Sequence, residues 1–298
     1  MRMKRRSFLQ NSSFAISATT IPSWARFLQL NPYEMKLIRR NVGFFTEKGG
    51  TIGYLMQPEG IVVIDAQFKE QSEHLIKELQ SKSSAPFQYL INTHHHGDHT
   101  SGNIAYKGLA QHVLAHENSK INQMNSAIKN QNEADQLYPD MTYKDRWQQS
   151  IGDETIDIQY WGPGHTNGDS IIHFQKANVV HCGDLVFNRK YPFIDKPAGA
   201  MIENWIDILQ QLQSNFDNDA IFIFGHAGEG YKVTGNKDDL AAMADYFTAL
   251  LEFITSQIQA GKSKEEIMMA TEIPGASQWK GDGIQRSLDA AHEELRTK

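Results

Sequence analysis

The sequence predicts an α/β (α+β) fold in which β-sheets are stacked in layers and helices cover the outside. Two observations support this prediction. Short apolar segments with strand character recur in two groups, between residues 51 and 115 and between residues 156 and 224. The C-terminal part instead repeats large apolar residues at the spacing of one helix face. Two strand-rich halves, each with helices to cover an outer face, favour a layered sandwich.

The first half of the chain contains the first group of strands. They are predicted at residues 51–56, 61–64, 87–91 and 113–115. The turn signal Pro58-Glu59-Gly60 joins the first two strands. A helix with Leu75 and Leu79 on its apolar face follows the second strand, and a helical stretch follows the fourth.

The second half repeats this pattern and then becomes helical. Its strands are predicted at residues 156–160, 170–174, 179–181 and 220–224. One helix face then carries Leu240, Met243, Phe247, Leu250, Leu251 and Ile254. Gly261 ends this helix, and Ser263-Lys264-Glu265-Glu266 has the pattern of a capping box that begins the next one.

Residues 117–150 are rich in Asn, Gln and Lys and contain few large apolar residues. Two interpretations remain open: an insertion or lid beside a functional site, or two surface helices with a loop. No internal repeat and no linker interrupt the chain, so we expect one domain from residue 26 to residue 298.

The composition narrows the classes of partner. The formal net charge of -6 disfavours nucleic acid, because phosphate binding needs a basic surface. No apolar stretch approaches the roughly 20 residues needed to span a bilayer. The single cysteine, Cys182, excludes a disulfide within the chain. We therefore expect a small-molecule substrate, and the sequence does not indicate the oligomeric state.

The N-terminus has the pattern of an export signal. Basic residues are followed by Arg5-Arg6-Ser7-Phe8-Leu9, a mildly apolar stretch and a small-x-small pattern near residue 25. Paired arginines before Ser-Phe-Leu resemble a twin-arginine signal, so we predict that residues 1–25 direct the protein to the periplasm. The alternative is a disordered basic N-terminus.

A cluster of histidines follows the third predicted strand, in Thr93-His94-His95-His96-Gly97-Asp98-His99. Imidazole nitrogens and carboxylate oxygens are ligands that zinc and similar divalent ions prefer. Clustered histidines without a metal would serve no packing purpose, and they would repel one another once protonated. The cluster therefore predicts a metal site.

Three later segments supply further candidate ligands. His165 lies in the glycine-rich run Gly162-Pro163-Gly164-His165-Thr166. Asp184 follows a predicted strand in Cys182-Gly183-Asp184, and His226 follows another in Gly225-His226-Ala227. In each segment a metal-binding side chain stands next to glycine beside a strand, so we expect all three to join the histidine cluster.

The pattern His-x-His-x-Asp-His, followed by His165, Asp184 and His226 in that order, resembles the metallo-β-lactamase-fold superfamily. The resemblance implies a four-layer αββα sandwich with the site at one edge of the two sheets. It implies that His94, His96 and His165 hold one metal, that Asp98, His99 and His226 hold a second, and that Asp184 bridges both.

The bridging carboxylate narrows the resemblance. Asp184 stands where lactamase branches have cysteine or serine, so the chain is more similar to thioesterase, lactonase and phosphodiesterase branches. Cys182 is interpreted as a small buried residue. The runs at residues 162–170, 183–188 and 191–195 are similar to exported proteins called quinoprotein-relay zinc metallohydrolases.

This resemblance implies a hydrolase in which two zinc ions, with iron or manganese as alternatives, activate water against a lactam, lactone, ester or thioester. Asp98 would ligate a metal and orient the water. We expect Asn188 and Tyr191 either to contact substrate or to be ordinary loop residues. His95 either points away from the metals or contacts substrate. The alternatives are a single-iron oxygenase of sulfur compounds and a metal-bound accessory protein without turnover.

Overall fold

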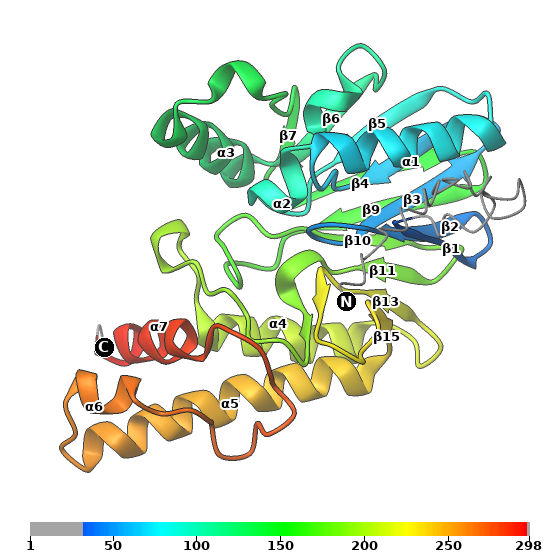
Figure 1. Ribbon diagram of the computed structural model, residues 1–298. Coiled ribbons are helices and arrows are strands. Elements are labelled where there is room, and N and C mark those ends of the chain that lie inside the picture. The colour runs from blue at the N-terminus through cyan, green and yellow to red at the C-terminus, as the bar shows by residue number, and fades with distance from the viewer. Residues whose placement is uncertain (1–31, 297–298) are drawn as a thin grey trace, which may run out of the picture. The chain divides into compact units, whose positions relative to one another are not determined.

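The computed structural model describes residues 32–296, and from Tyr33 onward the chain forms one compact unit. The export signal predicted at residues 1–25 lies outside the described residues. Within that unit, two sheets of seven and six strands are stacked, and helices cover both outer faces (Figure 1). The predicted four-layer αββα sandwich is confirmed.

The first sheet combines an antiparallel meander with a parallel half. In spatial order its strands are β1 (Glu34–Arg39), β2 (Val42–Thr46), β3 (Ile52–Gln57), β4 (Gly60–Ile64), β5 (Phe87–Ile91), β6 (His112–His116) and β7 (Met141–Tyr143). Strands β1 to β4 are antiparallel, whereas β4 to β7 are parallel. The carboxyl ends of β4, β5 and β6 therefore meet at one edge of the sheet.

The second sheet has one parallel pair at a corresponding place. In spatial order its strands are β15 (Thr234–Gly235), β13 (Ile221–Ile223), β11 (Val179–His181), β10 (Ile171–Phe174), β9 (Glu154–Gln159) and β8 (Arg146–Ile151). Only β11 and β13 are parallel among these described strands. Beyond their carboxyl ends, β12 (Phe187–Asn188) pairs with β14 (His226–Ala227) in a small separate sheet.

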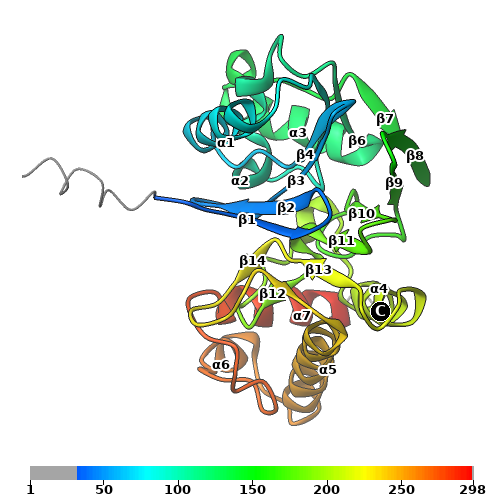
Figure 2. The ribbon, with the colours of Figure 1, turned by 90° about the vertical axis from the view of Figure 1, so that its right-hand side faces the viewer.

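The helices divide between the two outer faces, as the second view shows (Figure 2). On the first sheet's side lie α1 (Lys69–Lys82), α2 (Gly97–Thr100) and α3 (Glu117–Asn130). On the second sheet's side lie α4 (Ile202–Asn215), α5 (Lys237–Gln259), α6 (Lys264–Met268) and α7 (Ile284–Arg296). Four short 3₁₀ helices are η2 (Asn103–Tyr106), η3 (Glu133–Asp135), η4 (Gly183–Leu185) and η5 (Lys196–Ala198).

Three apolar cores separate the four layers. One core, around Leu75 and Leu79, lies between α1 and the first sheet. The core between the sheets is rich in β-branched residues such as Val62 and Ile172. The largest lies under α4, α5 and α7 and contains Trp205 and Phe247. Because each sheet is buried on both faces, its central strands, such as β4 and β11, are continuous apolar runs.

The C-terminal helices begin where their capping residues stand. Asn236 caps α5 in a capping box with Asp239. The box predicted at Ser263 is present and begins α6, where Glu266 closes it. Gly261, just after α5, has φ +76, a left-handed conformation that glycine adopts without strain.

The main strands predicted from sequence are confirmed within one or two residues, but residues 117–150 differ from both interpretations. They form α3, η3 and then the strands β7 and β8, which extend one sheet each. The second helix is absent, because residues 146–151 pair along β9 as the edge strand of the second sheet. An edge strand is exposed on one side, which explains its polar sequence. The sequence analysis also assigned no element to β1, β2 or α4.

Replacing Phe247 tests the largest core. Its ring is fully buried and lies 4.5 Å from the Trp205 ring, measured between centroids. Phe247→Ala should lower the free energy of unfolding by about 3–5 kcal/mol, because it removes a large buried side chain and leaves a cavity. Denaturant unfolding of metal-depleted protein measures this change. Ile258→Ala on the same helix is the matched control, since Ile258 is 37% exposed; equal losses in the two variants would contradict the assignment of this core.

Candidate metal centre

The seven predicted ligands converge at the edge where the carboxyl ends of the parallel strands meet. His94 and His96 follow β5, and Asp98 and His99 lie in α2. The other three come from the loop between β9 and β10, from η4 after β11, and from β14 after β13; they are His165, Asp184 and His226. Both sheets thus contribute to a single site.

The first group of ligands contains three imidazoles. His94 Nε2 lies 3.0 Å from His96 Nδ1, and His165 Nε2 lies 2.9 Å from the same atom. Asp184 Oδ2 completes the group at 3.7 Å from His94 Nε2 and 3.4 Å from His165 Nε2. One ligand atom from each of these four residues lies within 4.8 Å of all the others. Three nitrogens and one oxygen form a donor set that suits zinc.

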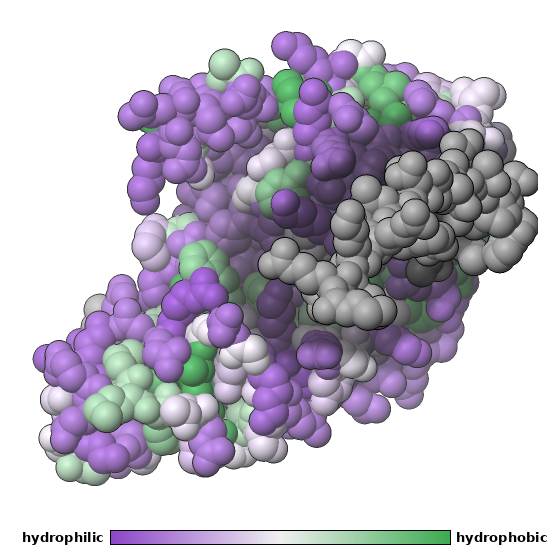
Figure 3. Space-filling view, viewed as in Figure 1, coloured by the Kyte–Doolittle hydropathy of each residue, from purple (hydrophilic) through white to green (hydrophobic). Residues whose placement is uncertain are grey.

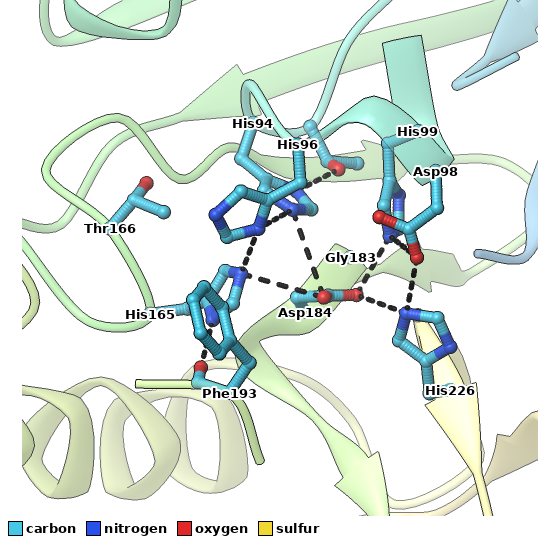
Figure 4. Close-up of polar contacts among 12 residues, drawn as sticks. His94, His96, Asp98, His99, His165, Thr166, Gly183, Asp184, Phe193 and His226 are labelled. Carbon is cyan, nitrogen blue, oxygen red and sulfur yellow. Dashed lines mark hydrogen bonds and ion pairs between the residues drawn. The ribbon is translucent and has the colours of Figure 1, made fainter. Parts of the chain in front are cut away.

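The second group shares the same carboxylate. Asp184 Oδ1 lies 3.0 Å from His99 Nε2 and 3.5 Å from His226 Nε2. Asp98 Oδ2 lies 3.1 Å from His226 Nε2 and 3.8 Å from His99 Nε2. Figure 4 shows Asp184 between the two groups, with one oxygen directed to each. A carboxylate in this position can bridge two ions.

Two buried polar atoms of the site have the surroundings expected of metal ligands. His99 Nε2 and Asp184 Oδ1 are close, but neither has a partner with hydrogen-bond geometry among the described residues. Buried polar atoms without such partners are rare in native proteins, and an ion is one accepted cause. Divalent ions at the two groups would satisfy both atoms.

Each histidine of the first group has its other ring nitrogen fixed. His96 Nε2 donates to Asp195 Oδ2 at 2.8 Å, and His165 Nδ1 donates to the carbonyl oxygen of Phe193 at 2.7 Å. His94 Nδ1 lies 3.0 Å from Thr93 Oγ1. These contacts place the ring proton away from the group and leave the inward nitrogen unprotonated, as metal binding requires.

Asp65 fixes the other ring nitrogen of His99, a histidine of the second group. It is fully buried at the end of β4, and its Oδ2 accepts from His99 Nδ1 at 2.7 Å. It also accepts from the Thr93 amide and hydroxyl, both at 2.7 Å. Asp65 has φ 65, which non-glycine residues adopt rarely. Three hydrogen bonds hold this conformation, so Asp65 ties the end of β4 to both metal-binding segments. Neither Asp65 nor Asp195 was predicted from the sequence to belong to the site.

Two glycines are required because ligands occupy the space of a side chain. A Cβ on Gly225 would lie 1.9 Å from Asp184 Oδ1, and a Cβ on Gly50 would lie 2.1 Å from His99 Cε1. Both distances are far below contact. Position 225, next to His226, therefore requires glycine, because a side chain there would overlap with Asp184.

The electrostatics differ between the histidines of the two groups. Burial lowers the pKa of His165 to about 3 and that of His94 well below its usual value, so both rings are neutral. Burial also opposes the charge on His99, but Asp184 and Asp65 raise its pKa well above the usual value. For Asp184, burial is outweighed by His226 and His99, which hold its pKa well below the usual value. The Asp184 carboxylate is therefore ionised.

The loop that carries His165 is shaped by Asp169. This buried carboxylate accepts from the Gly164 amide at 3.2 Å, from the Thr166 amide at 2.9 Å and from the Thr166 hydroxyl at 2.6 Å. Burial raises the pKa of Asp169 to about 7 despite these hydrogen bonds. Asp169 thus fixes the backbone on both sides of His165.

A cavity of about 390 Å³ opens onto the two groups. Its floor includes His96, Asp98, Asp184 and His226, and its walls include Phe187, Lys190, Tyr191, Phe193, Asp282 and Arg286. Figure 3 shows this face of the molecule hollowed between the part that carries α3 and the part that carries α7. Tyr191 lines the cavity. Asn188 does not; its amide donates to the carbonyl oxygen of Lys232, and its side-chain oxygen accepts from Arg189.

The remaining histidines and the cysteine have other partners. His95 belongs to neither group; its Nε2 lies 3.5 Å from Asp195 Oδ2, and it lines a separate polar cavity of about 60 Å³. His181 accepts from the Gly183 amide and contacts the carbonyl oxygen of Thr51. Cys182 is buried in the core, and burial raises the pKa of its thiol. His74 and His112 pair with acids at other places on the surface.

Comparison with known sequences gives a family match over this region. The profile of the Metallo-beta-lactamase superfamily matches residues 49–226. Metallo-beta-lactamase IND-1 from Chryseobacterium indologenes is 23% identical over 177 residues, which cover 58% of this chain and 70% of that protein. Metallo-beta-lactamase type 2 from Elizabethkingia meningoseptica is 22% identical over 174 residues, covering 58% and 67%.

Solved structures show the same fold. A metallo-beta-lactamase from Pontibacter korlensis has a TM-score of 0.61 at 21% identity and covers 72% of this chain and 99% of that chain. A variant of the sec-alkyl sulfatase PisA1 has a TM-score of 0.66 at 14% identity, covering 88% of this chain and 50% of that chain. The family profile spans all seven ligand positions and more than half of the sequence. The chain therefore belongs to the metallo-beta-lactamase superfamily.

Proposed function

We propose that this protein is a hydrolase that uses two divalent ions, zinc in the first instance, to attack an acyl-type bond such as a lactam, lactone, ester or thioester. The observation that carries the proposal is the buried Asp184 carboxylate, with one oxygen facing each group of ligands. Two ions held by these residues would lower the pKa of bound water toward 7 and polarise the substrate oxygen.

Asp98 is proposed to orient the attacking water. Its side chain is 33% exposed and lines the cavity. Burial is outweighed by the contacts with His226 and His99, which lower its pKa to about 2, so the carboxylate is ionised at neutral pH. Asp98 Oδ2 faces His226, while Oδ1 is available to accept a hydrogen bond from water in the cavity.

The alternatives are less well supported. A single-iron oxygenase would need only one group of ligands, and this chain has a second group with its own two histidines and an aspartate. A metal-bound accessory protein would not need an open cavity whose floor consists of the ligands.

Among the described residues, no helix has the length and apolar character to cross a bilayer.

Replacing ligands one at a time tests the two-metal arrangement. His165→Ala should remove mainly one ion and His226→Ala mainly the other, whereas Asp184→Ala should weaken both, because Asp184 faces both groups. We expect the purified protein to hold about two ions per chain. His96→Ala should also lower metal content and hydrolysis together. Elemental analysis measures the content, and a panel of chromogenic esters, lactams and phosphodiesters measures hydrolysis, with and without a chelator.

Cys182→Ala is the matched control for this series, because Cys182 lies two residues from Asp184 but is buried away from the ligands. It should keep the full metal content. Full metal and full activity in Asp184→Ala would refute the ligand assignment. A two-zinc protein without turnover on the whole panel would favour the accessory role.

Replacing Asp195 tests how His96 is held. Asp195→Asn keeps the size of the side chain but replaces the ionised acceptor of His96 Nε2 with a neutral amide. Metal affinity should fall about 10–100-fold, as is typical when such a partner is lost. Competition with a chromogenic chelator measures the affinity. Asp282→Asn, in the cavity wall, is the control, and an equal loss there would show that removal of a nearby charge is responsible.

Export is proposed from the N-terminal pattern alone. If residues 1–25 are a twin-arginine signal, Arg5→Lys combined with Arg6→Lys should retain the precursor inside the cell, because the pair of arginines is the recognised feature. Fractionation followed by immunoblotting measures the distribution. Lys4→Arg is the control, and unchanged export of the double variant would exclude this route.

A further inference from the structure

Two cations in the cavity wall have no acidic partner within residues 32–296. Lys190 and Arg286 both line the cavity above the metal ligands, and both are exposed. No ion pair of either is found among the described residues. Neighbouring cations differ, since Arg189 pairs with Asp239 at 2.7 Å and Lys196 pairs with Glu294 at 3.0 Å. The two cations that face the cavity are therefore available to bind an anionic ligand.

Arg286 lies one side chain away from a metal ligand. Its guanidinium is 5.6 Å from the centroid of the Phe193 ring, and the Phe193 ring is 5.2 Å from the His96 ring. Phe193 is 38% exposed although it is apolar, and it forms part of the cavity wall. A substrate whose reacting bond lies at the ligands can thus pack against Phe193 and reach Arg286.

Both cations stand on fixed supports. Lys190 pairs with Lys280 in a parallel bridge, and the preceding Arg189 is held by Asp239. Arg286 belongs to α7, whose Glu294 accepts from the Ile202 amide at 2.9 Å and caps the beginning of α4. Fixed supports reduce the entropy that a ligand must offset when it binds.

The charge balance of the cavity favours an anion. Asp98 and Asp184 would be compensated by two divalent ions, and Lys190 and Arg286 then add positive charge against the single carboxylate of Asp282. A cavity lined mainly by one sign of charge attracts the opposite sign. Arg286 lies outside residues 49–226, so the family match assigns it no role.

We propose that Lys190 and Arg286 form a subsite for a carboxylate carried by the acyl substrate. This proposal rests on the proposed hydrolase function and narrows the substrate class to acyl compounds with an anionic group. The carboxylate would lie between the two cations while Phe193 contacts the intervening carbons. Arginine suits this task because its planar fork matches a carboxylate.

A matched pair of esters tests the subsite. Mono-para-nitrophenyl succinate carries a terminal carboxylate, and para-nitrophenyl butyrate is its neutral counterpart. The wild-type kcat/KM should be higher for the succinate ester. In Arg286→Gln and in Lys190→Gln the ratio of the two kcat/KM values should fall about tenfold, mainly through KM of the succinate ester. Lys280→Gln removes a positive charge from the adjoining segment but not from the cavity wall, and it should keep the wild-type ratio.

A binding measurement separates the subsite from the hydrolase function. Titration of the metal-loaded protein with N-phenylsuccinamic acid and with neutral N-phenylbutyramide should show preference for the acid, and both Gln variants should lose it. This preference without hydrolysis would keep the subsite and overturn the proposed function. Hydrolysis of both esters with equal kcat/KM, unchanged in the Gln variants, would keep the hydrolase and overturn the subsite.

Discussion

The Asp184 carboxylate lies almost out of contact with solvent between two groups of imidazoles, and the site is organised around it. Burial of a charged group is costly unless partners compensate for it. His99 and His226, whose pKa values are raised, provide that compensation at Oδ1, at 3.0 Å and 3.5 Å. The neutral rings of His94 and His165 face Oδ2 at 3.7 Å and 3.4 Å, where an ion would compensate the charge. This arrangement requires β11 and β13 to run parallel, so that Asp184 and His226 emerge together. It also requires glycine at position 225, where any side chain would displace the carboxylate.

The segment from residue 189 to residue 196 connects this centre to the C-terminal helices. On its inner side, the Phe193 carbonyl holds His165 and Asp195 holds His96. On its outer side, Arg189 and Lys196 pair with acids of α5 and α7. The profile match ends at residue 226, yet two ligands of the first group are oriented through a segment that residues beyond 226 support. The C-terminal helices are thus part of the structure that shapes the site.

Much of the fold could be predicted from the sequence, because buried strands and amphipathic helices have strong periodic patterns. The strand at residues 87–91 and the capping box at Ser263 are examples. Strand β8 gave no such pattern, since its sequence, Arg-Trp-Gln-Gln-Ser-Ile, is polar and only pairing along β9 makes it a strand. Helix α4 carried a readable apolar face in Ile202, Trp205 and Leu209, which the sequence analysis did not use.

The residues that converge at the site could be predicted, because the motif places metal-binding residue types at recognisable positions. The acidic residues that hold the histidines in place could not be predicted from the sequence. Asp65 and Asp195 are ordinary acids in the sequence, and their task depends on contacts with His99, 34 residues away, and with His96, 99 residues away. Acids that directly follow a buried strand, as Asp65 does, are a usable signal for such partners. Asp195 lies in an irregular segment, and Arg286 lies near the beginning of α7. Which groups these two side chains contact is visible only in the folded structure.

The two groups of ligands are not equivalent, and the difference indicates the side from which substrate approaches. His94 and His165 are 1% and 0% exposed and are neutral. Asp98 and His226 are 33% and 13% exposed and form part of the cavity floor. An incoming molecule therefore meets His96 of the first group and Asp98 and His226 of the second, whereas His94 and His165 are buried. Because Phe193 lies beside His96 and Arg286 lies beside Phe193, the reacting bond and a distant anionic group can be held at different places in the same cavity.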